Sequence, residues 1–295
     1  MLDVVIIGSG PAGITAAIYA KRANLNVAVV EKEYLGTGQI AESSRVDNYP
    51  GIPGIDGYSL GEKFREHAES LGVEFTEAQV LSLGQKDGIW IIGCDEDITL
   101  ESKAVIYATG CKNRPLGVPG EEKYYGRGLS FCAVCDGAFY KGKRVAVIGG
   151  GDTALDDAMY LSDICEKVYL VHRREFFRGS ASTLEKLKQK ENVEIIVNVR
   201  VEEITGDKKI DGIILDNKTK LNISGLFAAV GMIPQTELLK EFGVLDESNY
   251  VKASEDTKTT VNGLFAAGDV RTKQLRQVVT AAADGANAIY SVMEY

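Results

Sequence analysis

A glycine-rich turn between two apolar runs constrains the fold of this sequence most. The apolar run 4–7 leads into GSGPAG at 8–13, a helical stretch follows, and a second apolar run, 27–30, ends at Glu31. In such a unit the first glycine makes a tight turn, the second lets the backbone approach a pyrophosphate, and the third lets helix and strand pack closely. The sequence therefore predicts a buried parallel sheet with a dinucleotide site at the start of a helix.

The same unit occurs a second time in the middle of the chain. The apolar run 145–148 leads into GGGDTA at 149–154, and the run 168–171 ends at His172. His172 follows its first glycine by the same number of residues as Glu31 does in the first unit. We therefore expect an α/β fold with two Rossmann-like, three-layer nucleotide-binding domains.

The two units differ in the residues that end the second apolar run. Glu31 is a carboxylate, which favours a ribose with free hydroxyls, so the first unit is predicted to bind FAD or NAD. In the second unit HRR at 172–174 takes this place, with Arg178 shortly after it. Arginines form forked, charge-assisted hydrogen bonds with phosphate, so the second unit is predicted to bind NADPH, although a solvated basic turn would have the same composition.

Proline-bearing stretches mark the predicted domain boundaries. They are KNRPLGVPG at 112–120 and GMIPQTE at 231–237. We expect the second domain to be inserted into the first. The predicted FAD-binding domain comprises residues 1–112 and 239–295, and the predicted NADPH-binding domain comprises residues 113–238.

Three further segments are consistent with a flavin site. GLFAAVG at 225–231 and GLFAAGD at 263–269 are near repeats whose small residues allow a cofactor to approach, and Asp269 could bind a polyol such as the flavin ribitol. Apolar residues recur at helical spacing from Arg276 to the end of the chain. A helix that begins near Gln277 could direct its N–H groups at the flavin pyrimidine and stabilise reduced flavin.

Charge and composition exclude several classes of protein. The chain has 295 residues, a net charge of −9 and an ordinary apolar content, so a nucleic-acid partner is not expected. No signal peptide and no apolar run long enough to span a membrane is recognisable, so a cytoplasmic location is expected. The five cysteines are widely spread, which does not fit the disulfide framework of a secreted protein.

The pair Cys132 and Cys135 in FCAVCDGAFY leaves several interpretations open. A C-x-x-C sequence can be a redox disulfide, half of a zinc site, or two packed thiols. Zinc needs about four ligands, whereas this chain has one such pair and only two histidines, so no metal is expected. Asp136 next to the pair could be a turn residue, although an acid beside a thiol also suits proton delivery.

The sequence resembles the low-molecular-weight thioredoxin reductases, which belong to class II of the FAD- and NAD(P)-dependent pyridine nucleotide-disulfide oxidoreductases, and the resemblance extends over essentially the whole chain. It is carried by GSGPAG at 8–13, DNYPG at 47–51, ATG at 108–110, CAVCDG at 132–137, GGGDTA at 149–154, HRR-x-x-x-R at 172–178, GDV at 268–270 and RQV at 276–278. Cysteines just before the second Rossmann unit are specific to this family. The resemblance implies FAD, NADPH, a homodimer, and rotation of the nicotinamide domain between two states.

The resemblance also implies a reaction and roles for individual residues. NADPH would reduce FAD by hydride transfer, FAD would reduce the Cys132–Cys135 disulfide, and the dithiol would reduce thioredoxin by thiol–disulfide exchange. Cys135 would lie against the flavin, Cys132 would attack the substrate disulfide, and Asp136 would donate and accept the proton. The redox disulfide is therefore the favoured interpretation of the C-x-x-C pair.

The candidate cofactor residues lie in the glycine turns, at the strand ends and at the start of the last helix. For FAD they are Gly8, Ser9, Gly10, Pro11, Ala12, Gly13, Glu31, Gln39, Asn48, Val80, Thr109, Gly110, Asp269, Arg276, Gln277 and Val278. For NADPH they are Gly151, Asp152, Thr153, His172, Arg173, Arg174 and Arg178. The chain departs from the family pattern at GTGQ (36–39), at Tyr49 and at Val134, and none of these departures removes a reactive group.

Other functions remain open at this stage. The same flavin and disulfide chemistry could use ferredoxin as the electron donor or another thioredoxin-like partner, and the basic HRR cluster favours NADPH over ferredoxin. A flavin-dependent NADPH oxidoreductase that passes electrons to a one-electron carrier would not need the cysteines. A redox-sensing flavin protein would show no rapid turnover of NADPH.

Overall fold

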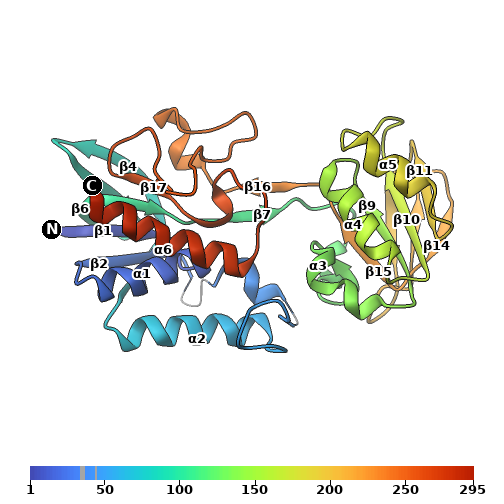
Figure 1. Ribbon diagram of the computed structural model, residues 1–295, viewed down its shortest axis with the longest axis horizontal. Helices are drawn as coiled ribbons and strands as arrows, with labels where there is room; N and C mark the ends of the chain where they lie inside the picture. The colour runs from blue at the N-terminus through green and yellow to red at the C-terminus, as the bar shows by residue number, and fades with distance from the viewer. Residues whose placement is uncertain (34–36, 44) are drawn as a thin grey trace. The chain divides into compact units, whose positions relative to one another are not determined.

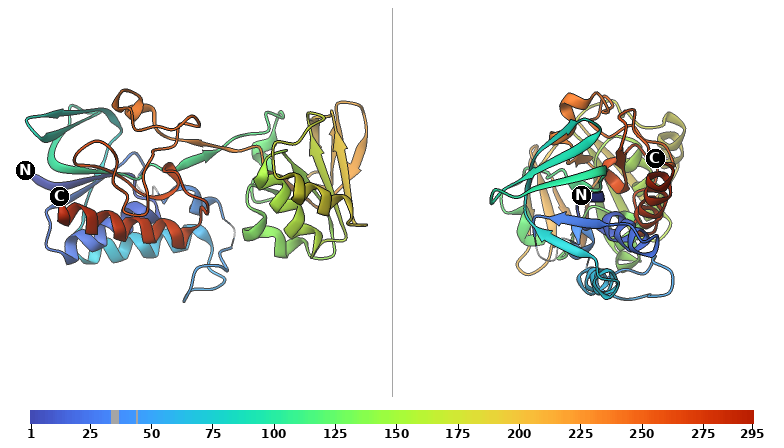
Figure 2. Two further views of the ribbon diagram at one scale, coloured as in Figure 1. Left: turned by 45° about the horizontal axis from the view of Figure 1, so that its top comes forward. Right: turned by 90° about the vertical axis from the view of Figure 1, so that its left-hand side faces the viewer.

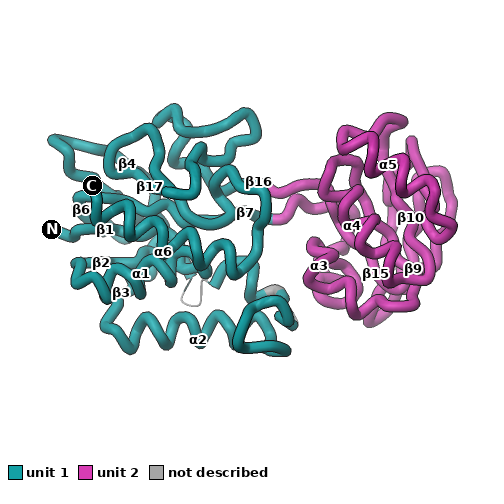
Figure 3. The backbone as a smooth tube through the Cα atoms, viewed as in Figure 1, with its two compact units in different colours: residues 1–112, 233–295 teal, residues 113–232 magenta. Residues whose placement is uncertain are grey.

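The protein folds into two compact units; the main sheet of unit 1 is mixed, and that of unit 2 is parallel. The computed structural model describes residues 1–33, 37–43 and 45–295. Unit 1 contains residues 1–112 and 233–295, and unit 2 contains residues 113–232 (Figure 1, Figure 3). The second unit is inserted into the first, and the prediction of an α/β fold with two Rossmann-like domains is confirmed.

The sheet of unit 1 has seven strands. They are β1 (Leu2–Ile7), β2 (Val27–Glu31), β3 (Glu74–Glu77), β4 (Val80–Lys86), β5 (Ile89–Cys94), β6 (Thr99–Tyr107) and β17 (Leu264–Ala266). The strand order is β3-β2-β1-β6-β5-β4, with β17 also paired to β6. The pairs among β3, β2, β1, β6 and β17 are parallel, whereas β4, β5 and β6 form an antiparallel meander. The carboxyl ends of the parallel strands therefore lie at one edge of the sheet.

Both faces of the unit 1 sheet are buried. Val4 and Ile6 of β1 join one apolar cluster, and Val5 and Ile7 join the other, because successive side chains of a strand point to opposite faces. The helices of unit 1 are α1 (Pro11–Arg22), α2 (Gly57–Ser70) and α6 (Val278–Glu294), and its 3₁₀ turns are η1 (Gly38–Glu42), η4 (Glu237–Phe242) and η5 (Gly268–Val270). The first cluster contains residues of α1, α2 and α6, so these helices cover one face of the sheet.

Helices α1 and α6 lie side by side over the sheet (Figure 1, Figure 2). Their backbones approach closely at Gly285, where a Cβ atom would lie 2.1 Å from the carbonyl oxygen of Ala12. Only glycine fits at such a contact. This contact fixes the position of α6 against the start of α1, directly after the first glycine turn.

Unit 2 also has three layers. Its parallel sheet, in the order β11-β10-β9-β15-β8, consists of β8 (Leu129–Ser130), β9 (Arg144–Ile148), β10 (Lys167–His172), β11 (Val193–Val197) and β15 (Gly225–Ala228). The helices are α3 (Ala133–Asp136), α4 (Asp152–Ser162) and α5 (Ala181–Lys188), with the 3₁₀ turns η2 (Glu121–Tyr124) and η3 (Gly137–Tyr140). A three-stranded antiparallel sheet is formed by β12 (Val201–Thr205), β13 (Gly212–Leu215) and β14 (Lys220–Asn222). Helices pack on one face of the parallel sheet, and the antiparallel sheet packs on the other.

The two crossings between the units pair with each other as β7 (Cys111–Asn113) and β16 (Met232–Pro234). The second boundary lies between residues 232 and 233, earlier than the 238/239 boundary expected from sequence. The reason is that the carbonyl oxygen of Gln235 accepts hydrogen bonds from Tyr107 Oη (2.9 Å) and Thr109 Oγ1 (2.8 Å) in unit 1. The segment after the crossing is thereby bound to the first unit.

Candidate functional site

The glycines of the first turn have different structural roles. A Cβ atom at Gly8, where φ is +101°, would lie 2.6 Å from the carbonyl oxygen of Ala108, and one at Gly13 would lie 1.9 Å from the carbonyl oxygen of Gly8. At Gly10 the nearest atom among the described residues is the carbonyl oxygen of Thr37, 3.9 Å away. Gly8 and Gly13 are therefore required by packing, whereas Gly10 leaves open space over its backbone.

The start of α1 fits a dinucleotide pyrophosphate. Gly10 is the N-cap in an extended conformation, Pro11 is the first helical residue, and no described side chain caps the helix. Uncapped N–H groups and the helix dipole favour an anion at this end. The open backbone at Gly10 lies at the same place, which is what close approach of a phosphate requires.

Glu31, at the carboxyl end of β2, is fixed beside the first turn. Its Oε2 accepts hydrogen bonds from the backbone N–H (2.8 Å) and the hydroxyl (3.0 Å) of Ser9. Its Oε1 accepts a hydrogen bond from the backbone N–H of Lys32 at 2.7 Å. These donors orient the carboxylate and leave lone pairs with which it could bind ribose hydroxyls.

Besides Trp90 Nε1 in β5, three buried polar atoms of unit 1 have no hydrogen-bond partner among the described residues: Asp269 Oδ1, Gln39 Nε2 and Thr37 Oγ1. Burial raises the pKa of Asp269, and the cations Lys273 and Arg276 oppose this shift. Buried polar groups are almost always paired, so unpaired ones indicate a ligand. Asp269 and Gln39 were predicted to contact FAD, whereas Thr37 was not, since GTGQ at 36–39 departs from the family pattern. Gly36 of the same loop lies outside the described residues.

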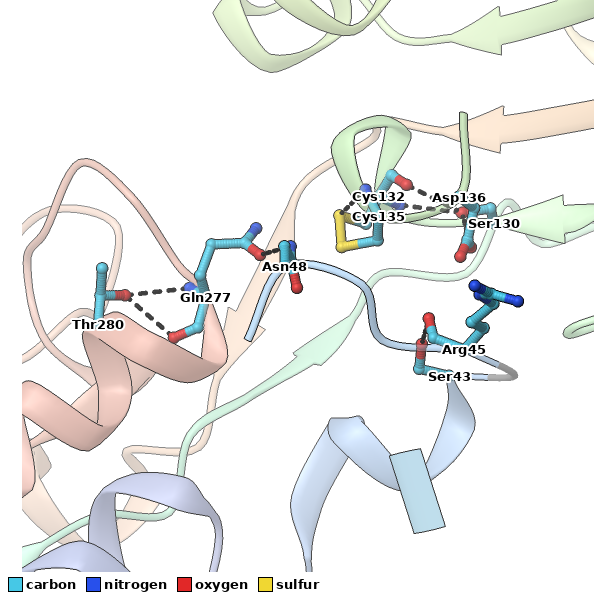
Figure 4. The surroundings of a disulfide bond; sticks show 9 residues. All are labelled: Ser43, Arg45, Asn48, Ser130, Cys132, Cys135, Asp136, Gln277 and Thr280. Carbon is cyan, nitrogen blue, oxygen red and sulfur yellow. Dashed lines mark hydrogen bonds between the residues drawn. A yellow bond between two sulfur atoms is a disulfide. The ribbon is translucent and has the colours of Figure 1, made fainter. Parts of the chain in front are cut away.

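Helix α6 begins as the sequence predicted. Gln277 is the N-cap, and Val278 is the first helical residue. The backbone N–H of Gln277 donates to Thr280 Oγ1 at 3.1 Å, and Asn48 Nδ2 donates to the side-chain oxygen of Gln277 at 2.9 Å (Figure 4). Asn48, far away in the sequence, therefore holds the helix start in place.

The remaining predicted FAD residues of unit 1 have structural contacts. Thr109 Oγ1 is bound to the Gln235 carbonyl, and Gly110, with φ of +66°, accepts from the Gln235 N–H at 3.1 Å. Val80 begins β4 and packs, half-buried, against the second apolar cluster. Arg276 Nε donates to the carbonyl oxygen of Asp269 at 3.3 Å. Arg276 is therefore attached to the segment that carries the unpaired carboxylate.

The second glycine turn has the same design as the first. A Cβ atom at Gly149 would lie 2.3 Å from the carbonyl oxygen of Ala229 and 2.7 Å from Ala154 Cβ. At Gly151, the N-cap of α4, no described atom lies within 4 Å of such a Cβ position, and no side chain of the described residues caps the helix. The start of α4 therefore also fits a pyrophosphate.

Residues 178–180 pack against this second turn. The backbone N–H of Arg178 donates to the carbonyl oxygen of Gly150 at 2.7 Å, and the N–H of Ser180 donates to Asp152 Oδ1 at 2.7 Å. A Cβ atom at Gly179 would lie 2.8 Å from the backbone nitrogen of Asp152. Arg178 is therefore held beside the glycine turn, and Gly179, which was not singled out from sequence, makes this close packing possible. Thr153 is exposed in the first turn of α4.

His172 differs from its arginine neighbours. It is 7% exposed, its ring centroid lies 4.9 Å from that of Phe177, and its Nε2 has no partner among the described residues. Burial, together with the nearby arginines, lowers the pKa of His172, so the ring is neutral at neutral pH. The positive charge that the sequence assigns to the whole cluster is therefore carried by Arg173, Arg174 and Arg178, which are exposed.

Cys132 and Cys135 form a disulfide in unit 2, with Cα atoms 5.3 Å apart (Figure 4). Cys132 is the N-cap of α3, and its Sγ accepts a hydrogen bond from the backbone N–H of Cys135 at 3.2 Å. The interpretation as two unlinked packed thiols is therefore excluded. The described residues contain no group of three or more His, Cys, Asp or Glu that could hold a metal ion.

Asp136 lies next to the disulfide and is linked to it through Ser130. Ser130 Oγ donates to Asp136 Oδ2 at 2.6 Å and accepts from the backbone N–H of Cys132 at 3.1 Å (Figure 4). Burial raises the pKa of Asp136, and the bond from Ser130 opposes this shift. A raised pKa makes a carboxyl group better able to hold a proton and to donate it to a neighbouring group. Ser130 was not found from sequence because nothing in the local pattern marks it.

The other three cysteines are free and buried. Cys111 Sγ donates to the carbonyl oxygen of Asp269 at 2.9 Å, and Cys165 Sγ donates to that of Tyr140 at 3.3 Å. Burial raises the pKa of Cys111 to about 12 and that of Cys165 to about 11. These thiols, like Cys94, whose pKa burial also raises, are packed groups rather than nucleophiles.

In the part of the chain that the structure describes, no helix is both long and apolar enough to cross a membrane.

Comparison with known proteins gives matches along essentially the whole chain. A family model described as pyridine nucleotide-disulphide oxidoreductase matches residues 2–285. The thioredoxin reductase of Bacillus subtilis is 38% identical over 301 residues, which cover 99% of this chain and 94% of that protein. A Clostridium pasteurianum protein described as a 34.2 kDa protein in the rubredoxin operon is 39% identical over 302 residues, covering 100% of this chain and 97% of the relative.

A solved structure gives the same result. The crystal structure of thioredoxin reductase from Streptococcus pyogenes has a TM-score of 0.93 and 40% identity, and the match covers 100% of this chain and 98% of that chain. The resemblance inferred from the glycine turns and the C-x-x-C pair is thereby confirmed. The chain belongs to the pyridine nucleotide-disulphide oxidoreductase family and, within it, to the thioredoxin reductases.

Proposed function

We propose that this protein is an NADPH-dependent thioredoxin-disulfide reductase that uses FAD. The overall reaction converts NADPH, a proton and the disulfide of thioredoxin into NADP⁺ and the thioredoxin dithiol. The observation that carries the proposal is the Cys132–Cys135 disulfide beside the buried Asp136, in a chain with two dinucleotide turns. Relatives named thioredoxin reductase cover the whole length of both units.

Unit 1 would hold FAD. The pyrophosphate would bind at Gly10 and the start of α1, and the Glu31 carboxylate would accept hydrogen bonds from the ribose. Asp269 Oδ1 and Gln39 Nε2, which are buried and unpaired among the described residues, would bind polar groups of the flavin nucleotide. Bound FAD would accept a hydride from NADPH and pass an electron pair to the disulfide.

Unit 2 would hold NADPH. The pyrophosphate would bind at Gly151 and the start of α4, where no described side chain caps the helix. Arg173, Arg174 and Arg178 would bind the 2′-phosphate through charge-assisted hydrogen bonds. The neutral His172 ring would contribute its unpaired Nε2 and a flat surface rather than charge.

The reduced cysteine pair would transfer its electrons by thiol–disulfide exchange. The thiolate of Cys132 attacks one sulfur of the thioredoxin disulfide, the second thioredoxin sulfur leaves as a thiolate, and a mixed disulfide forms. Cys135 then attacks Cys132, which releases the thioredoxin dithiol and restores the disulfide. The N–H of Cys135 that donates to Cys132 Sγ would stabilise the attacking thiolate. Asp136, held by Ser130, would supply the proton to the leaving sulfur.

Rates of NADPH-dependent thiol release from thioredoxin test this assignment. We expect Cys132→Ser and Cys135→Ser to abolish turnover, because either substitution removes half of the disulfide. Cys165→Ser is a matched control, since Cys165 is a free, buried cysteine of the same unit, and it should retain activity. Turnover in the Cys132→Ser variant would instead favour a flavin oxidoreductase that does not use thiols.

We propose a homodimer that forms through unit 1. Val279, Tyr290 and Met293 are 42%, 65% and 59% exposed, and their spacing places them on one side of α6. Such an exposed apolar face is typical of an interaction surface, and a second copy could cover it symmetrically. Light scattering should give the mass of a dimer for the wild type and of a monomer for Tyr290→Asp/Met293→Asp. Phe176→Asp, an exposed residue of unit 2, is the control and should leave the mass unchanged.

We also propose a cytoplasmic location. Cys94, Cys111 and Cys165 are free thiols, and a reducing compartment keeps thiols in this state. Detection of the protein in membrane or extracellular fractions of its source cells would contradict this proposal.

A further inference from the structure

A buried ion cluster lies in unit 1 beside the segment that carries Asp269. Asp284 Oδ1 accepts from Arg271 Nη2 at 2.6 Å, and Asp284 Oδ2 accepts from Arg271 Nε and Lys273 Nζ, each at 2.8 Å. The side chains of Arg271, Lys273 and Asp284 are only 9%, 7% and 5% exposed. Burial acts to raise the pKa of Asp284, but the hydrogen bonds from Arg271 and Lys273 outweigh it and lower the pKa, so the group is a carboxylate.

Asp284 also holds the backbone of the turn that presents Asp269. The backbone N–H of Gly268 donates to Asp284 Oδ2 at 2.9 Å. Gly268 has a φ of +81°, and a Cβ atom there would lie 2.9 Å from Ala12 Cβ at the start of α1. The turn is thereby pressed against the first glycine turn. Asp284 therefore determines where the unpaired Asp269 carboxylate lies relative to the uncapped helix start.

The same carboxylate connects this turn to α6. Asp284 lies in α6, whose N-cap is Gln277, so one helix carries both the acid and the predicted flavin-facing end. Arg276, next to that end, donates to the carbonyl oxygens of Asp269 (3.3 Å) and Arg271 (3.4 Å). Arg271 Nη1 extends the network to the carbonyl oxygen of Ala253 at 3.2 Å. The segment from Gly268 to Gln277 is thus one hydrogen-bonded unit with Asp284 at its centre.

A buried ion cluster of this kind is weak support for stability but well suited to fix a geometry, because an apolar cluster would pack the same space without directing hydrogen bonds. Nothing in the thiol chemistry or at the nicotinamide site requires it. Its contacts go to the two segments that would meet the flavin nucleotide.

We propose that Asp284 is a positioning residue for the FAD site, holding the Asp269 turn and the start of α6 in the arrangement that binds the flavin nucleotide. This inference rests on the proposed binding of FAD in unit 1. Asp284 itself would not touch the cofactor. It would act through the Gly268 N–H and the side chains of Arg271 and Lys273.

The test compares Asp284→Asn with Ser291→Ala. Ser291 is the matched control, because it is 2% exposed on the same helix and its Oγ donates to the carbonyl oxygen of Asp256 at 2.6 Å, away from the Gly268–Gln277 segment. FAD is released from each purified holoenzyme and titrated back, and flavin fluorescence gives the dissociation constant. We expect Asp284→Asn to raise this constant by about 10- to 100-fold, since it removes charge-assisted hydrogen bonds, with kcat largely restored at saturating FAD. Ser291→Ala should lower only the unfolding temperature.

The outcomes separate this inference from the proposed function. If the wild type binds no FAD, the proposed function fails as well. If the wild type binds FAD and Asp284→Asn binds it as tightly as Ser291→Ala does, the positioning role alone is refuted. If Asp284→Asn does not fold, Lys273→Met provides the test, because this variant keeps the Arg271–Asp284 pair. We expect Lys273→Met to raise the dissociation constant of FAD about fivefold. An unchanged constant would overturn the inference.

Discussion

The two glycine turns share a backbone design but differ at two coupled positions. In both, the first glycine is required by packing, and the residue before the helix leaves open space for a ligand. In the first turn the middle residue is Ser9, whose N–H and hydroxyl bind Glu31. In the second turn the middle residue is Gly150, where a Cβ atom would lie 2.2 Å from the His172 ring. The middle residue and the strand-end residue thus form a matched pair in each unit.

This difference shows how one turn can serve two nucleotides. A hydroxyl at the middle position orients a carboxylate, as at Ser9 and Glu31, and in the proposed function this carboxylate would bind ribose hydroxyls. In the second turn, glycine at this position leaves room for the neutral His172 ring, and the positive charge lies on the exposed arginines that follow His172. In the proposed function, the backbone would therefore set where the phosphates bind, and the paired side chains would set which nucleotide is preferred.

The largest expected effect concerns the three arginines of unit 2. We expect Arg173→Ala/Arg174→Ala/Arg178→Ala to lower kcat/KM for NADPH by about 100-fold or more, because each charge-assisted hydrogen bond contributes roughly 1.5–3 kcal/mol. The value for NADH should change little, since NADH lacks the 2′-phosphate. Steady-state kinetics with both nucleotides measures the ratio of kcat/KM for NADPH to that for NADH. An equal loss for both nucleotides would show that the arginines do not bind the 2′-phosphate.

The matched pairs can be exchanged between the units. Gly150→Ser should destabilise unit 2 by about 1–3 kcal/mol, because the added atoms overlap the His172 ring. The double variant Gly150→Ser/His172→Glu, which reproduces the Ser9–Glu31 pair, should recover stability and shift preference toward NADH. Denaturant unfolding and nucleotide kinetics measure the two effects. A double variant that is no more stable than the single one would mean that the positions are not coupled.

The helices that follow the two turns also differ. Counted from the first glycine, Asp157 of α4 takes the position of Ala16 of α1, which is fully buried. Burial, with the charge of Asp156 adding to it, raises the pKa of Asp157 to about 7. A carboxyl group whose pKa is raised on folding favours the folded state below its ordinary pKa and loses this contribution as the pH rises through about 7.

The pH dependence of Asp157→Asn follows from this sign. The free energy of unfolding of the variant minus that of the wild type should therefore increase by about 2 kcal/mol from pH 5 to pH 8. One pKa unit corresponds to about 1.4 kcal/mol, and solvent screening reduces the sum. Urea unfolding at both pH values measures the gain. Glu122→Gln, which removes an exposed charge of the same unit outside α4, is the control, and a pH-independent difference for Asp157→Asn would contradict the shift.

The smallest effect on folding is expected at the open glycines. Gly10→Ala and Gly151→Ala should each change stability by no more than about 0.5 kcal/mol, since both backbones are extended and have space for a methyl group. Each should nevertheless weaken binding of its own nucleotide roughly tenfold, because the methyl group meets the pyrophosphate. Loss of FAD from the second variant, or of NADPH binding from the first, would reverse the assignment of the two units.

Much of the fold was predictable because it rests on local patterns. The apolar runs that end at Glu31 and His172 are β2 and β10, and the helix expected near Gln277 begins at Val278. The domain boundary at residue 238 was wrong by several residues, because the Gln235 carbonyl binds Tyr107 and Thr109, which are distant in sequence.

The less predictable parts of the site depend on contacts between distant residues. Ser130 bridges the disulfide and Asp136, and Gly150 accommodates the His172 ring, yet neither contact follows from spacing or composition. His172 is neutral because it is buried, and this burial could not be inferred from the basic HRR sequence. Asp284, Arg271 and Lys273 would be read from sequence as surface charges and are instead a buried cluster.

The proposed function is tested most directly by an anaerobic titration of the FAD-loaded enzyme with NADPH, followed by addition of thioredoxin and a thiol assay. NADPH should bleach the flavin absorbance, and thioredoxin thiols should then appear in the wild type but not in Cys132→Ser. If NADPH fails to bleach the flavin, while dithionite does so and normal thiol release follows, the disulfide chemistry stands but the assignment of unit 2 to NADPH is contradicted.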